Sequence, residues 1–286
     1  MAALQATFPV LIYFFVLCFG LIVGSFLNVV IYRLPVMMER EWDEQAREIL
    51  KLEAPPTATA FNLMVPGSRC PGCGHAIRAW ENIPVLSYVF LRGACSACQT
   101  PISIRYPLVE LLTGGLSVLV IWRFGLTPAG LACCLLTFGL IAASLIDYDT
   151  QLIPDSITLP LLWLGLIVNS ANLVAPFMDA FWGAVAGYLV LWVVYQVFKL
   201  VTGKEGMGFG DFKLLAMLGA WMGWQMLPLI ILGSSLAGTI IGGSLIALGR
   251  DRSHPIPFGP YLAIAGFVAL IWGDTIVASY LQFAAF

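Results

Sequence analysis

Long apolar stretches separated by short polar segments dominate this chain. Stretches of membrane-spanning length cover residues 10–33, 107–123, 127–147, 157–174, 181–200, 211–226, 228–248 and 259–285. Because roughly 20 apolar residues let a helix cross the hydrocarbon core, the pattern predicts about eight transmembrane helices. The sixth stretch is the shortest and the weakest of these predictions. The expected fold class is therefore an all-α polytopic membrane protein.

The main interruption of the apolar pattern lies between the first and second stretches. Residues 34–106 hold seven of the 14 basic residues and open with a charged run, 39–53, that predicts an amphipathic surface helix. A Pro-rich segment then leads into a region with four cysteines. We expect three parts: a first transmembrane helix (1–33), a small cytoplasmic metal-binding domain (34–106) and a seven-helix membrane core (107–286).

Composition agrees with a membrane protein and excludes several functions. Of the 286 residues, 60% are hydrophobic and 10% are charged, and the mean hydropathy is +0.91. A net charge of −2 without a basic patch interleaved with aromatic residues gives no indication of nucleic-acid binding. If the N-terminus lies outside, all basic residues except Arg123 fall on the inner side. This asymmetry predicts that both termini are outside.

Two Cys-x-x-Cys pairs occur in the polar segment, Cys70 with Cys73 and Cys95 with Cys98. Four thiolates on two tight turns favour one structural zinc ion, although the spacer between the pairs is slightly longer than usual. Disulfides are the first alternative, but they are rare in the reducing compartment that the topology predicts. Thiol redox catalysis is the second, and it would favour a pair near the outer face. His75 could replace one thiolate.

Acidic residues at the ends of apolar stretches are the strongest indication of catalysis. Asp147 ends the third stretch and Asp211 begins the sixth, both on the predicted cytoplasmic side. A carboxylate at membrane depth costs roughly 2.5–3.5 kcal/mol on insertion scales, so it favours a functional role. Two carboxylates at hydrogen-bonding distance share a proton and serve as acid and base, as in aspartic proteases. Asp149 should point elsewhere, and Asp155 is predicted to cap the next helix.

Glycines alternate before the second aspartate, at Gly206, Gly208 and Gly210. Their spacing fits neither a dinucleotide-binding nor a Walker loop. Without side chains they would let the backbone of a substrate approach Asp211. A flexible turn with a helix-capping aspartate remains an alternative. Membrane-embedded acids also occur in ion-coupled transporters, but those lie near the bilayer midplane and often in repeated halves.

Several motifs in order along the chain resemble the bacterial type IV prepilin peptidases, which are aspartic peptidases of the GxGD type and also N-methyltransferases. They are GSFLNVVIYRLP, the segment from Cys70 to Glu110, LIDYDTQLIPD, GMGFGDFK and PFGPYL. The resemblance implies that Asp147 and Asp211 are catalytic and that the four cysteines bind metal. It also implies a location in the bacterial inner membrane, with catalysis at the cytoplasmic face.

The same resemblance implies the substrates. These are prepilins and pseudopilins with a short basic leader that ends in Gly and is cut before a hydrophobic residue, usually Phe. The new amine is then methylated from S-adenosylmethionine, a step that no fingerprint in this sequence indicates. We expect the methyl-donor site around Glu81, Gly93 and Arg105. Substrate contacts are expected at Gly208, Gly210 and Glu110, although a helix-capping or snorkelling role is the more common one for an acid placed like Glu110.

Overall fold

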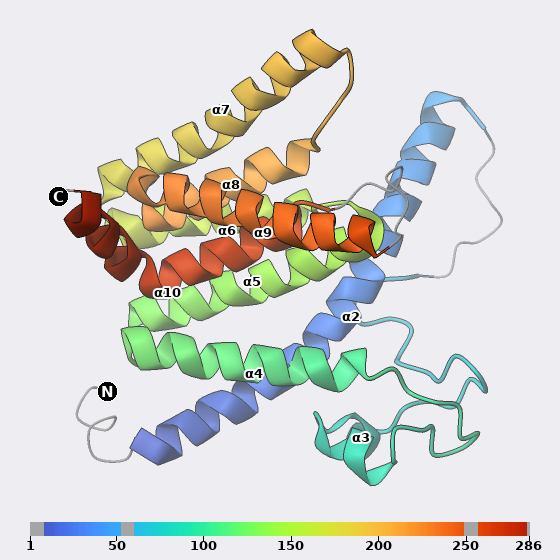
Figure 1. The fold of residues 1–286 in the computed structure, drawn as a ribbon. Coiled ribbons are helices and arrows are strands. Elements are labelled where there is room, and N and C mark those ends of the chain that lie inside the picture. Colours follow the sequence, from blue (N-terminus) through green and yellow to red (C-terminus); the bar gives the residue numbers. More distant parts are fainter. Residues whose placement is uncertain (1–8, 53–59, 249–256, 285–286) are drawn as a thin grey trace. The chain divides into compact units, whose positions relative to one another are not determined.

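The computed structural model describes residues 9–52, 60–248 and 257–284, and most of them are helical (Figure 1). Among these residues there are no strands, only two isolated β-bridges in the cysteine region. Six helices are long and apolar enough to cross a membrane, which confirms the all-α polytopic class. They are α2 (Pro9–Ile49), α4 (Arg105–Phe124), α5 (Pro128–Thr150), α7 (Phe177–Thr202), α9 (Leu227–Ala247) and α10 (Gly259–Ala284).

Two further apolar helices are shorter than a usual membrane span. They are α6 (Asp155–Ser170), with 16 residues, and α8 (Phe209–Met222), with 14. At 1.5 Å per residue, α8 is about 21 Å long, against a hydrocarbon core of about 30 Å. They correspond to the predicted stretches 157–174 and 211–226. The count of eight spans therefore stays a prediction.

The chain divides into two compact units, residues 1–125 and 126–286. In the first unit, α2 is one continuous helix of 41 residues that passes through Pro35. The separate surface helix predicted for residues 39–53 is therefore wrong: its described part continues the first membrane helix. The continuation is rich in good helix formers and carries an ion pair of 2.9 Å between Asp43 and Arg47.

Small residues bring α2 and α4 together within the first unit. A Cβ added to Gly20 would lie 2.8 Å from the Cα of Gly114, and one added to Gly24 would lie 2.7 Å from the Cα of Glu110. This is the close packing that the GxxxG spacing of Gly20 and Gly24 predicts. The cysteine region follows as irregular chain with the short helices η1 (Ala79–Asn82) and α3 (Leu86–Phe90).

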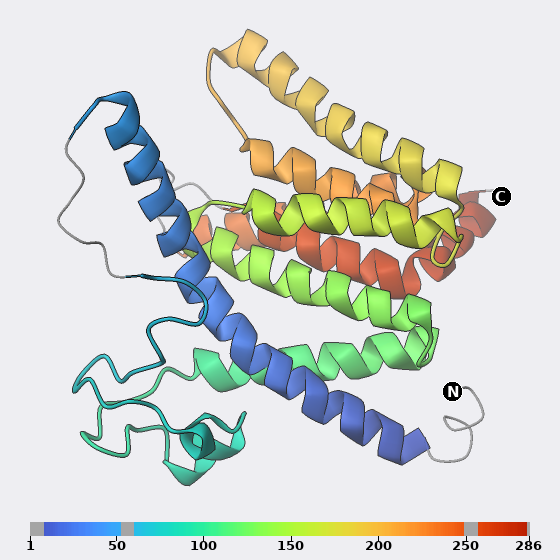
Figure 2. The same ribbon diagram turned by 180° about the vertical axis from the view of Figure 1, so that it is seen from behind.

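In the second unit, α8 lies between α6 and α7 (Figure 2). Helices α6, α7 and α10 pack against α8, and nearly all of its side chains are buried. On the α7 side, Gly183 lies against the backbone of Gly219, and Gly187 lies against the backbone of Leu215. A second GxxxG spacing thus makes the tightest helix contact of this unit.

A buried polar residue joins the ends of α6 and α8. Asn169 is fully buried, and its amide nitrogen donates to the carbonyls of Ala220 and Trp221, at 2.9 Å each. Its amide oxygen accepts from the backbone N–H groups of Val174 and Ala175. Because each polar atom has a partner, this asparagine can be buried without a desolvation penalty left uncompensated. The short α8 is thereby fixed at the end opposite Asp211.

Candidate active site and metal centre

Asp147 lies in the last turn of α5, within an otherwise apolar core. It is 5% exposed, and Gln151 in the left-handed conformation ends the helix just after it. The backbone N–H of Gly259 donates to Asp147 Oδ2 at 2.9 Å, from the first residue of α10. A Cβ on residue 259 would lie 2.6 Å from the same oxygen. Only glycine allows this contact.

Asp211 lies in the first turn of α8 and is 7% exposed. Gly208 is the N-cap of this helix, and its carbonyl accepts from the N–H of Asp211 at 3.3 Å. The carboxylates of Asp211 and Asp147 interact electrostatically. The two acids, 64 positions apart in sequence, therefore lie close enough within one unit for the charge of Asp147 to act on Asp211.

One apolar side chain lies between the backbones that position both aspartates. Ile153, in the short loop between α5 and α6, contacts Gly210 and Gly259. A Cβ on Gly210 would lie 2.8 Å from Ile153 Cβ, and one on Gly259 would lie 3.0 Å from Ile153 Cδ1. Gly210 precedes Asp211, and Gly259 donates to Asp147. Ile153 thus packs against both the residue that precedes Asp211 and the residue that donates to Asp147.

The alternating glycines differ in their surroundings. Gly208 is exposed, and the atom nearest to a Cβ there would be Asp211 Oδ2 at 3.9 Å. By contrast, Gly206 and Gly210 would collide with the ring of Phe198 and with Ile153. Gly208 is therefore the position where a substrate backbone has room beside the carboxylate, whereas Gly210 already has a packing role.

The other two acids of the α5–α6 region lie elsewhere. Asp149 is exposed, in agreement with its predicted direction away from Asp147. The prediction that Asp155 caps α6 is wrong, because Pro154 is the N-cap and Asp155 is the first helical residue. Its carboxylate instead accepts from Lys213 Nζ on α8, at 2.7 Å to each oxygen. Asp155 therefore forms an ion pair with a lysine of another helix and does not cap its own.

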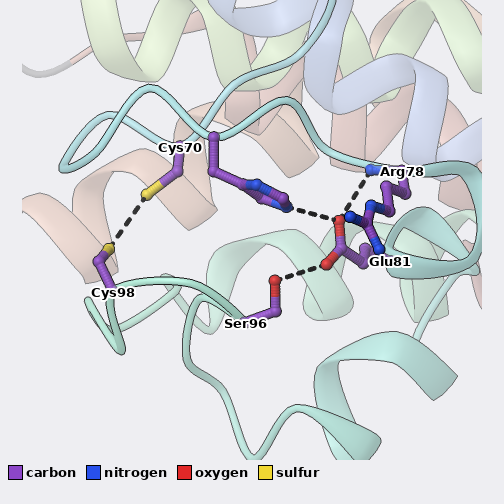
Figure 3. A network of polar contacts seen from close by, with 6 residues as sticks. Cys70, Arg78, Glu81, Ser96 and Cys98 are labelled. Atoms are coloured by element: carbon purple, nitrogen blue, oxygen red, sulfur yellow. Dashed lines mark hydrogen bonds and ion pairs between the residues drawn. The ribbon is translucent and has the colours of Figure 1, made fainter.

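The four cysteines form a compact cluster in the first unit. Their sulfur atoms all lie within 4.8 Å of one another, and Cys70 Sγ lies 3.7 Å from Cys98 Sγ (Figure 3). Zn–S bonds of about 2.3 Å in a tetrahedron place sulfurs about 3.8 Å apart. The arrangement therefore fits one tetrathiolate zinc site, with Cys70 and Cys95 buried and Cys73 and Cys98 exposed.

The two cysteine turns have the same backbone plan. In each, the N–H of the first cysteine donates to the carbonyl five residues later, and its carbonyl accepts from the N–H four residues later. The residue after the second cysteine has a positive φ: 73° at Gly74 and 59° at Gln99. Each turn is closed by an isolated bridge, Arg69 with Ala76 and Ala94 with Pro101. The turns thus present two sulfurs each to a common point.

Glu81 joins the two cysteine turns. Its side chain is 5% exposed and accepts from the N–H of Arg78 at 2.8 Å and from Ser96 Oγ at 2.5 Å. It also contacts His75 Nε2 at 3.1 Å. Figure 3 shows Glu81 between Arg78 and Ser96. The bonds from Arg78 and Ser96 lower the pKa of Glu81 to about 2. His75 follows one turn and Ser96 lies inside the other, so the ionised glutamate holds them together.

The remaining predicted binding residues also lie in the first unit. Glu110 is 7% exposed in α4, and its Oε2 accepts from the N–H of Val85 at 2.7 Å. The hydroxyl of Ser25 also bonds to its carboxylate. Gly93 has a φ of 69° and lies against the Tyr88 ring, and Arg105 begins α4. Within this unit, Glu110 has a structural role as an anchor for Val85.

Comparisons with known proteins cover nearly the whole chain. Residues 18–124 match the Bacterial Peptidase A24 N-terminal domain, and residues 134–243 match the Type IV leader peptidase family. A prepilin leader peptidase/N-methyltransferase of Stutzerimonas stutzeri is 65% identical over 274 residues, which is 94% of this chain and 95% of the relative. The chain belongs to the type IV prepilin leader peptidase family.

Other members of the family agree in length and name. The proteins of Pseudomonas aeruginosa and Aeromonas salmonicida are 62% and 56% identical, with 95% of each relative covered. Both are named prepilin leader peptidase/N-methyltransferase. No solved structure matches the chain. The boundary between the two family matches, from residue 124 to residue 134, lies close to the division between the two structural units.

Three residues near the aspartates were not singled out from the sequence: Ile153, Lys213 and Gly259. Ile153 is an apolar residue in a short loop, and Lys213 is a basic residue near the start of a helix. Neither residue type is unusual at its position. Gly259 had a signal, because it lies in the PFGPYL motif that supports the family resemblance. That motif gave no role to the glycine, since nothing in it indicates that its backbone N–H bonds a carboxylate 112 positions away.

Proposed function

We propose that this protein is a membrane aspartic endopeptidase that removes the leader from type IV prepilins and pseudopilins, and that it then N-methylates the new terminus. One observation supports this most directly: Asp147 and Asp211 are buried acids on different helices whose carboxylates interact. Family membership supplies the peptide that they cut. The enzyme resides in the bacterial inner membrane, with its termini outside and catalysis at the cytoplasmic face.

The dyad catalyses hydrolysis by general acid and base. One carboxylate takes a proton from the water that attacks the scissile carbonyl, while its protonated partner donates a hydrogen bond to the carbonyl oxygen. Collapse of the tetrahedral intermediate then requires a proton on the leaving amine, and the dyad supplies it. Gly208 leaves space for the substrate backbone beside Asp211. The apolar surroundings exclude bulk water, which strengthens these interactions.

Methylation requires a methyl donor near the new amine. S-adenosylmethionine supplies the methyl group, and we place its site in the polar segment of the first unit, near Gly93 and Arg105. Glu81 is the less suitable member of the predicted set because it already holds the two cysteine turns. Glu110 is a proposed contact for the substrate amine, although its bonds to Val85 and Ser25 leave it a structural role as well.

The proposed zinc ion has a structural role. Cys70, Cys73, Cys95 and Cys98 would fill its coordination shell with thiolates, and such closed sites stabilise a fold and do not activate water. The segment has few buried apolar side chains, so metal ligation would replace a hydrophobic core. This assignment leaves hydrolysis to the aspartates of the other unit.

The function is tested with purified enzyme in detergent and one prepilin, with and without S-adenosylmethionine. Mass spectrometry separates the uncut, cut and methylated forms. We expect cleavage in both conditions and a gain of one methyl group only with the donor. Asp149→Asn serves as the matched control, since this exposed acid is two residues from the dyad, and it should retain cleavage while Asp147→Asn loses it. Cleavage by Asp147→Asn at the wild-type rate would refute the proposal.

A further inference from the structure

The ion pair between Asp155 and Lys213 joins α8, which carries Asp211, to the start of α6, just after the loop that follows Asp147 and α5. Lys213 Nζ lies 2.7 Å from both carboxylate oxygens of Asp155, so the contact is bidentate. Asp155 begins α6, directly after the loop from α5, and Lys213 lies in the first turns of α8. Neither aspartate of the dyad takes part. The pair therefore has no role in the proton transfers proposed above.

Its position relative to the dyad follows from helix geometry. Residues two apart on a helix point to different sides, so Lys213 does not point with Asp211. Accordingly, Asp211 is 7% exposed, whereas the Lys213 side chain is 28% exposed. Lys213 thus binds the start of α6 from outside, while Asp211 faces the core from the same turn.

The loop held by this pair is the one that contains Ile153. Only Pro154, whose ring restricts φ, separates Ile153 from Asp155. Ile153 in turn contacts Gly210, next to Asp211, and Gly259, which donates to Asp147. The loop from Asp147 therefore leads to Asp155, which is bound to Lys213 on α8. Lys213 lies two residues after Asp211 on the same helix. Loss of the ion pair would remove a charged contact between the start of α6 and α8.

We propose that Asp155 and Lys213 are positioning residues that hold the α5–α6 loop against α8 and so set the separation of the catalytic carboxylates. The proposal rests on the leader peptidase function for its activity readout. An isolated, partly exposed ion pair contributes little to global stability. Its effect should instead appear in catalysis, because a misplacement of about 1 Å can lower a rate about 100-fold.

Kinetics of prepilin cleavage provide the first test. Asp155→Asn and Lys213→Met should each lower kcat about tenfold with little change in KM, since the loop positions the dyad and does not bind the substrate. The double variant should be no worse than either single one, because both remove the same contact. Asp155→Glu and Lys213→Arg keep the charges and should retain most of the activity. Thermal unfolding should shift little in any of these variants.

The exchanged pair, Asp155→Lys with Lys213→Asp, separates positioning from a direct effect of charge. If the contact matters, the exchanged pair should recover kcat relative to the single substitutions. Single variants with wild-type kcat would overturn the proposal. An exchanged pair that recovers nothing would overturn it too, because the positive charge of Lys213 would then be the active feature.

Hydrogen exchange gives a readout that does not depend on the peptidase function. Amides of residues 151–155 and of the first turn of α8 should exchange faster in Asp155→Asn and Lys213→Met than in wild type, with α9 unchanged. Unchanged exchange in these segments would contradict the proposal even if the protein cut no prepilin. Failure of the wild-type enzyme to cut prepilin, with the exchange effect present, would contradict only the proposed function.

Discussion

The cysteine cluster and the two buried aspartates are positioned in different ways. Each cysteine turn is a local structure, closed by backbone hydrogen bonds within six residues and ending in a positive φ. The aspartates are held by contacts between helices: Asp147 by Gly259 of α10, and Asp211 by the packing of α8. The first site is built from two short stretches of chain that Glu81 joins, whereas the second depends on packing between helices of the second unit.

This difference predicts that loss of a metal ligand affects one unit and leaves the other folded. Cys70→Ser should lower the zinc content, measured by elemental analysis, from about one ion per chain to nearly none. Residues 60–104 should then become sensitive to limited proteolysis, because structural zinc sites contribute about 10–16 kcal/mol of binding free energy to the fold. Helices of residues 126–286 should stay protected. A wild-type protein without metal would contradict the structural-zinc assignment.

The aspartates should instead be sensitive to a single methyl group on α10, a helix that is distant from Asp147 in sequence but in contact with it. Gly259→Ala would place a Cβ 2.6 Å from Asp147 Oδ2, so the carboxylate or the start of α10 must shift. We expect kcat to fall about 100-fold, the scale of a displacement of about 1 Å. Gly233→Ala is the matched control, because the only atom near its Cβ would lie at 3.5 Å. Equal activities of the two variants would show that the contact at Asp147 does not matter.

The glycines before Asp211 sharpen the comparison further. Gly210→Ala would push on Ile153, so we expect kcat to fall about tenfold with KM nearly unchanged. Gly208→Ala adds a methyl group to an exposed position beside Asp211, where it should hinder the substrate and raise KM. Steady-state kinetics on one prepilin distinguish these effects. The reverse pattern would mean that Gly210 contacts the substrate.

The smallest effect is expected at Glu81, in the cysteine region. Glu81→Gln keeps the shape of the side chain and removes the charge that Arg78, Ser96 and His75 contact. Residues that orient metal ligands typically change affinity about 10- to 100-fold, and we expect the lower value because Glu81 acts on the turns and not on a ligand. Competition with a chelator measures it. Unchanged zinc affinity would show that the turns need no link beyond the metal.

The same contrast explains what the sequence could predict. The cysteine spacing indicates a metal site because its geometry is local: two residues between the ligands and a turn after them. The all-α class follows from the apolar stretches. Asp147 and Asp211 could be selected by their cost near the membrane, but the partners of Asp147 could not, since Gly259 is 112 positions away.

The wrong predictions arose where tertiary contacts override local preference. Asp155 fits a capping position by residue type, yet Lys213 on another helix attracts its carboxylate. The apolar pattern ends the first helix at residue 33 and predicts a separate helix from residue 39, yet α2 continues to Ile49. The α7–α8 contact at Gly183 and Gly187 has a GxxxG spacing, but its importance becomes visible only when the backbone of Gly219 is found opposite.

The central claim is that Asp147 and Asp211 act as one catalytic unit. Its most direct test is to measure kcat/KM for prepilin cleavage by Asp147→Asn, by Asp211→Asn and by the double variant. We predict that each single substitution lowers kcat/KM by about 10⁴-fold or more and that the double substitution lowers it no further, since residues that act together are strongly non-additive. A single variant that keeps a tenth of the wild-type kcat/KM, or losses that multiply in the double variant, would contradict it.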